Sequence, residues 1–209
     1  MVKQLLFSFI LGLSSLIAEQ TAPEKALKTL IDGNKRYIEN KSTHPNRAAE
    51  RRLETAKLQE PFAVILGCAD SRVSPEILFD QGIGDLFVVR VAGNVVSPVI
   101  LESIEFSALY LHSSIILVLG HENCGAVNAV LKGTTKDIET IAGLIGPAIE
   151  ESKNQKGDRL ENAIKDNVNN VVKQLRANPA LAKLLDEKKL GVIGGYYNFH
   201  SGEVEIIKQ

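Results

Sequence analysis

The chain contains two cysteines, and each stands in a short motif rich in side chains that bind metals or transfer protons. The first motif, C-A-D-S-R, runs from Cys68 to Arg72, and the second, H-E-N-C-G, runs from His121 through Cys124 to a glycine. Two thiolates and one imidazole form a ligand set that suits zinc. Because three protein ligands leave a fourth coordination position open for water, the set is typical of a catalytic zinc site.

The first motif also carries an acid and a base, Asp70 and Arg72. Arg72 is placed to form a two-pronged pair with Asp70 and keep it ionised, so that Asp70 accepts a hydrogen bond from water at the metal. Two alternatives stay open at this point. In the first, the pair only stabilises its own loop. In the second, Asp70 binds the metal as a fourth ligand and closes the site.

The first 18 residues differ in composition from the rest of the chain. Lys3 precedes an almost wholly apolar run over residues 5–17, and Ala18 precedes the polar Glu19. This pattern predicts a cleaved signal peptide over residues 1–18 and an exported, periplasmic protein. A retained membrane anchor and a soluble N-terminal helix of a cytoplasmic protein are the alternatives. The apolar run is shorter than an ordinary membrane span, so we expect none in the mature form.

Export would place both cysteines in an oxidising compartment, where a disulfide between Cys68 and Cys124 is the alternative to metal binding. Each cysteine lies among other catalytic side-chain types, which favours the metal. The remaining histidines, His44, His112 and His200, have no clustered partner in the sequence and are assigned surface or capping roles.

The length and charge of the chain restrict its class. Its 209 residues, 44% of them hydrophobic, suffice for one domain, which we place at residues 19–209. The formal net charge is −1. This balance gives no support to nucleic acid or an anionic membrane surface as a partner.

Apolar runs alternate with segments of helical periodicity along the chain. The runs at 62–66, 86–91, 115–119 and 190–197 predict buried strands, followed by a short strand at 204–207. Helices are expected between them, and two more at 24–39 and 47–58. The fold class is therefore α/β: a central, mostly parallel β-sheet flanked by helices, with an N-terminal helical arm.

The two motifs follow two of these strands. Cys68 comes just after the first strand and His121 just beyond the third, and functional sites of such sheets form at the carboxyl ends of strands. If the two strands are neighbours, the motifs meet. His121 and Cys124 are three residues apart on a turn that opens a helix, a spacing that predicts both side chains on one helix face.

Taken together, these motifs resemble those of the β-class carbonic anhydrases, over about residues 24–207. The resemblance rests on C-A-D-S-R-V, on G-D-L-F-V-V-R-V-A-G-N from Gly84 to Asn94, on G-H-E-N-C-G-A and on G-G-Y-Y near the end. It implies zinc-dependent, reversible hydration of CO2 to bicarbonate and a proton, with one Zn²⁺ per subunit. The competing functions are a CS2 or COS hydrolase on the same scaffold and a non-catalytic zinc-binding protein.

The resemblance also implies roles for individual residues. The zinc ligands of the family fall on Cys68, His121 and Cys124, and its Asp–Arg pair falls on Asp70 and Arg72. Its substrate-pocket residues fall on three further positions, Gln59, Phe87 and Phe106.

In the family this pocket is built partly by a neighbouring subunit, which implies a homodimer or homotetramer. A subgroup with an allosteric bicarbonate site carries tryptophan where this chain has Ile65. We therefore expect the open form of the site at neutral pH, with Asp70 off the metal.

Overall fold

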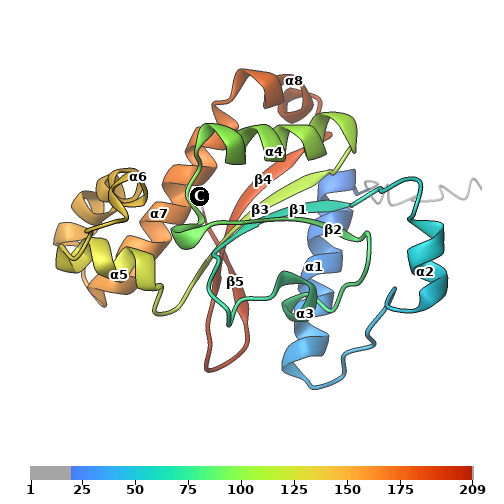
Figure 1. Ribbon diagram of the computed structural model, residues 1–209, viewed down its shortest axis with the longest axis horizontal. Coiled ribbons are helices and arrows are strands. Elements are labelled where there is room, and N and C mark those ends of the chain that lie inside the picture. Colours follow the sequence, from blue (N-terminus) through green and yellow to red (C-terminus); the bar gives the residue numbers. More distant parts are fainter. Residues whose placement is uncertain (1–19, 209) are drawn as a thin grey trace, which may run out of the picture.

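The computed structural model describes residues 20–208 (Figure 1). The predicted signal peptide, residues 1–18, lies outside the described residues, so export to the periplasm stays a prediction. Among residues 20–208, no helix combines the length and the apolar character needed to cross a bilayer.

Five strands form one sheet in the order β2-β1-β3-β4-β5, in which only β5 runs antiparallel to its neighbour. Their bounds are β1 Ala63–Gly67, β2 Leu86–Arg90, β3 Ile115–His121, β4 Gly191–Tyr197 and β5 Val204–Ile207. The predicted mostly parallel sheet is confirmed. β1 and β3 are hydrogen-bonded neighbours, as the convergence of the two motifs requires.

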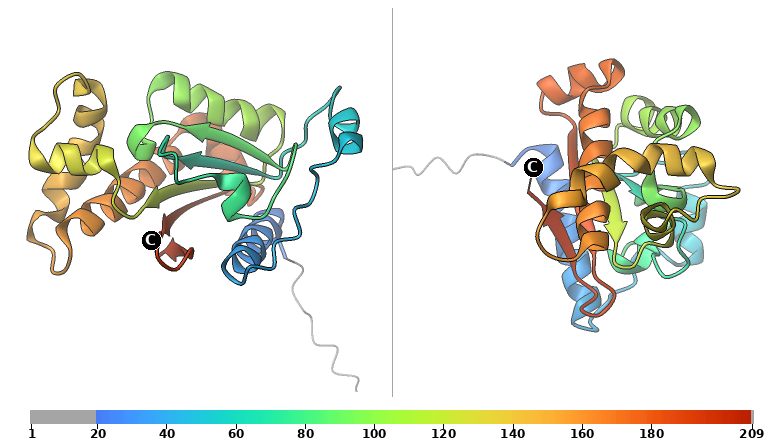
Figure 2. Two further views of the ribbon diagram at one scale, coloured as in Figure 1. Left: turned by 60° about the horizontal axis from the view of Figure 1, so that its bottom comes forward. Right: turned by 90° about the vertical axis from the view of Figure 1, so that its left-hand side faces the viewer.

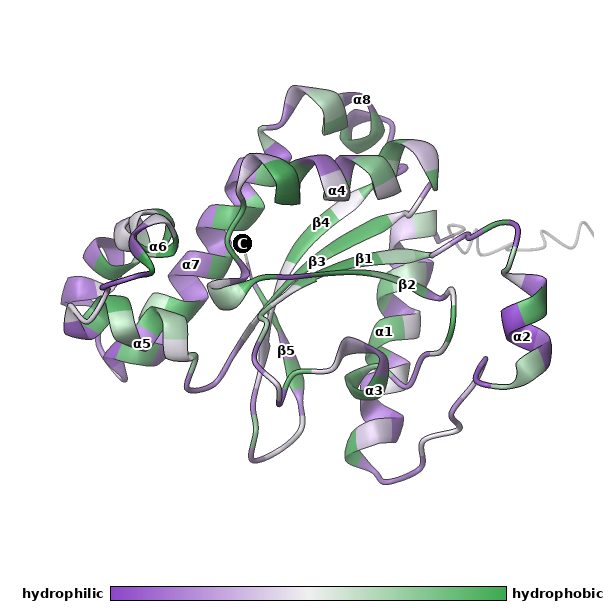
Figure 3. Ribbon diagram, viewed as in Figure 1, coloured by the Kyte–Doolittle hydropathy of each residue, from purple (hydrophilic) through white to green (hydrophobic). Residues whose placement is uncertain are grey.

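Helices cover both faces of the sheet, because successive side chains of a strand point to opposite faces. Val64 and Leu66 of β1 pack into a cluster with α4, α7 and α8, while Ala63 and Ile65 pack into another with α1 and α3. Figure 3 shows the resulting continuous hydrophobic colour of the central strands. The helices are α1 Ala22–Ile38, α3 Pro75–Leu78, α4 Pro98–Tyr110, α7 Arg159–Arg176 and α8 Pro179–Asp186.

A third apolar cluster lies beyond the carboxyl ends of β1 and β3, where α5, α6 and α7 meet (Figure 2). Helix α5 spans Gly125–Lys132 and helix α6 spans Glu139–Glu151. Short 3-10 turns span Ala92–Asn94 and Ser152–Asn154. The cluster includes Cys68 and Cys124. The two thiols are therefore surrounded by packed aliphatic side chains.

The N-terminal segment consists of two helices with different environments. α1 begins at a capping box formed by Thr21 and Glu24 and buries Leu30 against the sheet, so it is part of the core. The second helix, α2 (Ala49–Glu54), buries none of its residues and projects at one end of the molecule (Figure 1). The predicted helical arm is thus α2 and its connections.

A buried carboxylate ties the connection before α2 to the core. Asp80 has a fully buried side chain, and it accepts hydrogen bonds from Arg36 Nε (2.7 Å), from the backbone N–H groups of Thr43 and His44 (both 2.9 Å) and from Thr43 Oγ1 (3.1 Å). Burial opposes ionisation of Asp80, but these hydrogen bonds outweigh it and hold the pKa of the carboxyl well below its usual range.

Asp80→Asn is expected to lower the free energy of unfolding by about 3 kcal/mol at pH 7, because it leaves buried donors facing an amide instead of a charge. Asparagine tolerates the left-handed backbone at this position, where φ is 46°. Since the folded-state pKa of Asp80 is depressed, the wild-type advantage is present above about pH 4 and is lost as the pH falls further. Urea unfolding of both proteins at pH 7 measures the loss of stability, and the same experiment at pH 3 measures how far the difference shrinks.

Asp32→Asn is the matched control for this prediction. Asp32 forms an exposed i,i+4 pair with Lys28 on α1, and such a pair contributes about 0.5 kcal/mol or less. Equal losses of stability in the two variants would contradict the role assigned to Asp80.

Candidate metal centre

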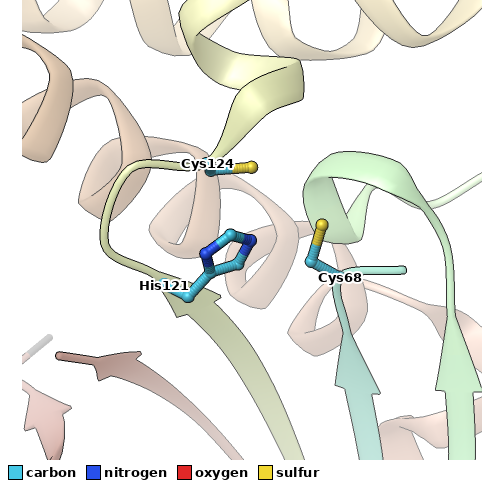
Figure 4. A group of neighbouring side chains, drawn as sticks. All are labelled: Cys68, His121 and Cys124. Atoms are coloured by element: carbon cyan, nitrogen blue, oxygen red, sulfur yellow. The ribbon is translucent and has the colours of Figure 1, made fainter. Parts of the chain in front are cut away.

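Cys68, His121 and Cys124 converge at the carboxyl edge of the sheet. Cys68 directly follows β1, His121 ends β3, and Cys124 is the N-cap residue of α5. The two sulfur atoms and a ring nitrogen of His121 all lie within 4.8 Å of one another. Figure 4 shows the three side chains pointing into one space from two strand ends and a helix start.

The structure corrects one detail of the prediction. His121 is the last residue of β3 rather than a residue beyond it, so His121 and Cys124 do not share a helix face. A turn brings them together instead, and Asn123 adopts the left-handed conformation (φ 52°) that reverses the chain there.

The orientation of the imidazole fits a metal ligand. Nδ1 of His121 lies 2.9 Å from the backbone oxygen of Glu122, and because a carbonyl only accepts, Nδ1 carries the proton. Nε2 therefore presents a lone pair. It is buried and has no hydrogen-bond partner among the described residues, an arrangement that is costly unless a cation occupies the space.

The two thiols form an interacting pair. Hydrogen bonding to Cys124 lowers the pKa of Cys68 to about 4, opposed by burial and assisted by His121 and by the backbone N–H of Gly93. The neighbouring Cys68 sulfur and burial raise the pKa of Cys124. Without a cation, one thiolate is favoured and the second is suppressed, and a bound cation would stabilise both.

Asp70 and Arg72 form a two-pronged ion pair beside these three ligands. Arg72 donates from Nε to Oδ1 (2.9 Å), from Nη2 to Oδ2 (2.8 Å) and from its backbone N–H to Oδ1 (3.0 Å). Hydrogen bonding to Arg72 holds the pKa of Asp70 well below its usual range, although partial burial opposes the shift. Oδ2 of Asp70 lies 3.9 Å from Nε2 of His121, so the carboxylate borders the space between the ligands.

Two residues that the sequence analysis did not identify hold this loop in place. Arg90, the last residue of β2, donates from Nε to the backbone oxygen of Cys68 (3.0 Å) and from Nη2 to that of Asp70 (2.6 Å). The ring of Phe199 packs against the guanidinium of Arg72, with Cζ of Arg72 4.2 Å from the ring centroid. The same ring contacts the imidazole of His121. For Arg90, its place at the end of a predicted strand was a sequence signal that could have indicated a role at the site. No feature of the sequence marked Phe199.

The three predicted pocket residues do not join this cluster within one chain. Phe87 lies opposite Val64, four residues before Cys68, or about 13 Å along the strands. Its ring is 6.4 Å from that of Phe106, which is 46% exposed. Gln59 is exposed on the connection between α2 and β1.

The remaining histidines occupy surface positions, but two of them have neighbours that the sequence did not reveal. His44 Nδ1 lies 3.9 Å from Oδ1 of Asp80, and His200 Nε2 lies 3.4 Å from Oε1 of Glu122. His112 is exposed after α4. No disulfide joins the cysteines; both are free and buried.

Fold and site together define an α/β protein with a buried Cys-His-Cys site at the carboxyl edge of its sheet, beside an Asp–Arg pair. The family model described as carbonic anhydrase matches residues 63–204. The carbonic anhydrase of Mycolicibacterium smegmatis is 38% identical over 191 residues, which cover 88% of this chain and 93% of that protein. Carbonic anhydrase 2 of Mycobacterium tuberculosis is 36% identical over 189 residues, which cover 87% of this chain and 91% of that protein.

Solved structures of β-class members are also similar to this chain. The Coccomyxa beta-carbonic anhydrase superposes with a TM-score of 0.66 at 28% identity, covering 88% of this chain and 86% of that one. A tetrameric beta-carbonic anhydrase of the ascomycete Sordaria macrospora superposes with a TM-score of 0.69 at 23% identity, covering 89% of this chain and 98% of that one. The chain belongs to the β-class carbonic anhydrase family.

Proposed function

We propose that this protein is a zinc enzyme that catalyses the reversible hydration of CO2 to bicarbonate and a proton. The observation that carries the proposal is the buried, unpartnered Nε2 of His121 between two thiols, next to an ionised carboxylate, in a chain of this family. Cys68, His121 and Cys124 would hold one Zn²⁺ per subunit. The ion would lower the pKa of a bound water and so supply a nucleophile near neutral pH.

Asp70 orients the attacking water in this proposal. An ionised carboxylate only accepts hydrogen bonds, so Asp70 accepts a hydrogen bond from the attacking water. This orientation directs a lone pair of the water oxygen toward the carbon of CO2. Arg72 keeps Asp70 ionised and fixes the plane of its carboxylate. The same pairing favours the open site, because Asp70 accepts three hydrogen bonds from Arg72 that movement onto the metal would disturb.

We also propose that the substrate pocket is completed by a second copy of the chain. Phe87 and Phe106 lie apart from the ligands of their own subunit, and Phe106 leaves nearly half of its surface exposed next to Tyr110, which is 72% exposed. An exposed aromatic patch of this kind is typical of an interface. The tetrameric relative supports an oligomer of two or four subunits.

Phe106→Glu is expected to dissociate the oligomer and to lower CO2 hydration at least tenfold, because a buried charge at an interface is costly and the pocket loses a wall. Light scattering and stopped-flow assays on the same sample measure both. The control is Leu144→Glu, an exposed apolar residue that lies on α6 and not on α4. Dissociation without loss of activity would contradict the shared pocket.

The proposed function is tested by counting zinc per chain and measuring stopped-flow hydration in one preparation. We expect about one zinc per subunit and fast hydration at neutral pH. Zinc without hydration up to about pH 9, together with turnover of CS2 or COS, would replace the proposal by the hydrolase alternative. Hydration confined to alkaline pH would contradict the open site.

A further inference from the structure

A buried asparagine links helix α7 to the loop that follows β2. Asn167 is 2% exposed, and its Nδ2 donates a hydrogen bond of 2.8 Å to the backbone oxygen of Gly93. The two residues are 74 positions apart in the sequence. The bond therefore connects the outer helical layer to the turn between β2 and α4.

Gly93 in turn contacts a ligand of the candidate metal centre. Its backbone N–H donates to Sγ of Cys68 at 3.4 Å, within the buried part of the site. Gly93 has a left-handed backbone (φ 72°), and a Cβ atom there would lie 2.8 Å from Cδ1 of Ile145. The left-handed backbone favours glycine at this position, and the turn lies in close contact with both Cys68 and α6.

Helix α7 is itself seated firmly next to the site. It packs against β3 at Gly120, the residue before His121, where an added Cβ would lie 2.7 Å from Val168 and 3.0 Å from Ile164. Asn167 is adjacent to Val168 on this helix. The position of Asn167 is therefore set by the same packing that holds the end of β3.

We propose that Asn167 is a positioning residue for the metal centre: it holds Gly93 so that the Gly93 N–H stays directed at the sulfur of Cys68. The inference rests on the proposed zinc site. A hydrogen bond to a ligand sulfur withdraws charge from it, and a site with two thiolates needs such withdrawal because thiolates donate more charge to the metal than imidazoles do.

A purely structural role makes a different prediction. An asparagine that only satisfies a buried carbonyl would affect stability and leave the sulfur unchanged. A positioning role changes the environment of one ligand, so it alters metal affinity and the spectrum of a metal–sulfur bond. These readouts separate the two roles.

The test compares Asn167→Ser with Asn170→Ser in zinc-chelator competition and in Co²⁺-substituted protein. Asn170 lies one turn further along α7 and donates to Glu151 on the exposed side, so it is a matched control. We expect the zinc Kd of Asn167→Ser to rise about tenfold and its sulfur-to-cobalt absorption band to shift. The control should keep the wild-type Kd within about twofold and the wild-type band.

Asn167→Leu is measured alongside as a second variant, in case the serine variant fails to fold. Leucine keeps the number and branching of the side-chain heavy atoms and removes the donor. A wild-type Kd and band in a folded Asn167 variant would overturn the inference, even if its Tm fell. Wild-type protein without tight zinc binding would instead overturn the proposed metal centre, and this inference with it.

Discussion

Asp70→Asn is expected to reduce kcat for CO2 hydration by about 10²-fold or more while zinc stays bound. An amide in place of the carboxylate is neutral and carries N–H groups, so it no longer enforces the water orientation that points a lone pair at carbon. Because Arg72 holds the pKa of Asp70 below its usual range, the wild-type carboxylate stays ionised throughout the neutral range. The loss should therefore be equally large from pH 6 to pH 9.

Stopped-flow hydration and metal analysis of the same Asp70→Asn sample measure this effect. Arg72→Gln keeps the carboxylate but removes two side-chain hydrogen bonds to it, and should cause a smaller loss. Asp32→Asn, in an exposed pair on α1, is the control and should retain wild-type turnover. Near-wild-type turnover of Asp70→Asn would show that the role assigned to the carboxylate is wrong.

His121→Ala is expected to abolish stoichiometric zinc binding and, with it, hydration. The substitution removes the one nitrogen ligand and leaves two thiols beside a cavity. Altering an outer partner of a zinc ligand weakens binding about 10–100-fold, so loss of the ligand itself should exceed that range. Chelator competition gives the Kd, and the zinc content after gel filtration gives the stoichiometry.

His112→Ala is the matched control, since His112 is exposed after α4 and away from the strand ends that carry the ligands. Wild-type protein stripped of zinc should lose activity and recover it when zinc returns, whereas His121→Ala should not recover. Full zinc occupancy in purified His121→Ala would refute the Cys-His-Cys centre.

The sequence by itself determined the ligand types and the scaffold that presents them. Continuous apolar runs predicted β1, β2, β3 and β4 within about two residues, because strands buried on both faces need apolar side chains at every position. The positions of Cys68 and His121 at strand ends followed from the same runs. The Asp70–Arg72 pair is local, two residues apart, so its formation could be anticipated without a fold.

Only the tertiary structure decided how the site is held. Hydrogen bonds from Arg90 to Cys68 and from Asn167 to Gly93 join residues 22 and 74 positions apart, and no local periodicity marks such partners. The separation of Phe87 from the ligands likewise depends on strand register. Periodicity reports which side of an element is buried, whereas the direction of a buried donor is set by the packing of whole elements against one another.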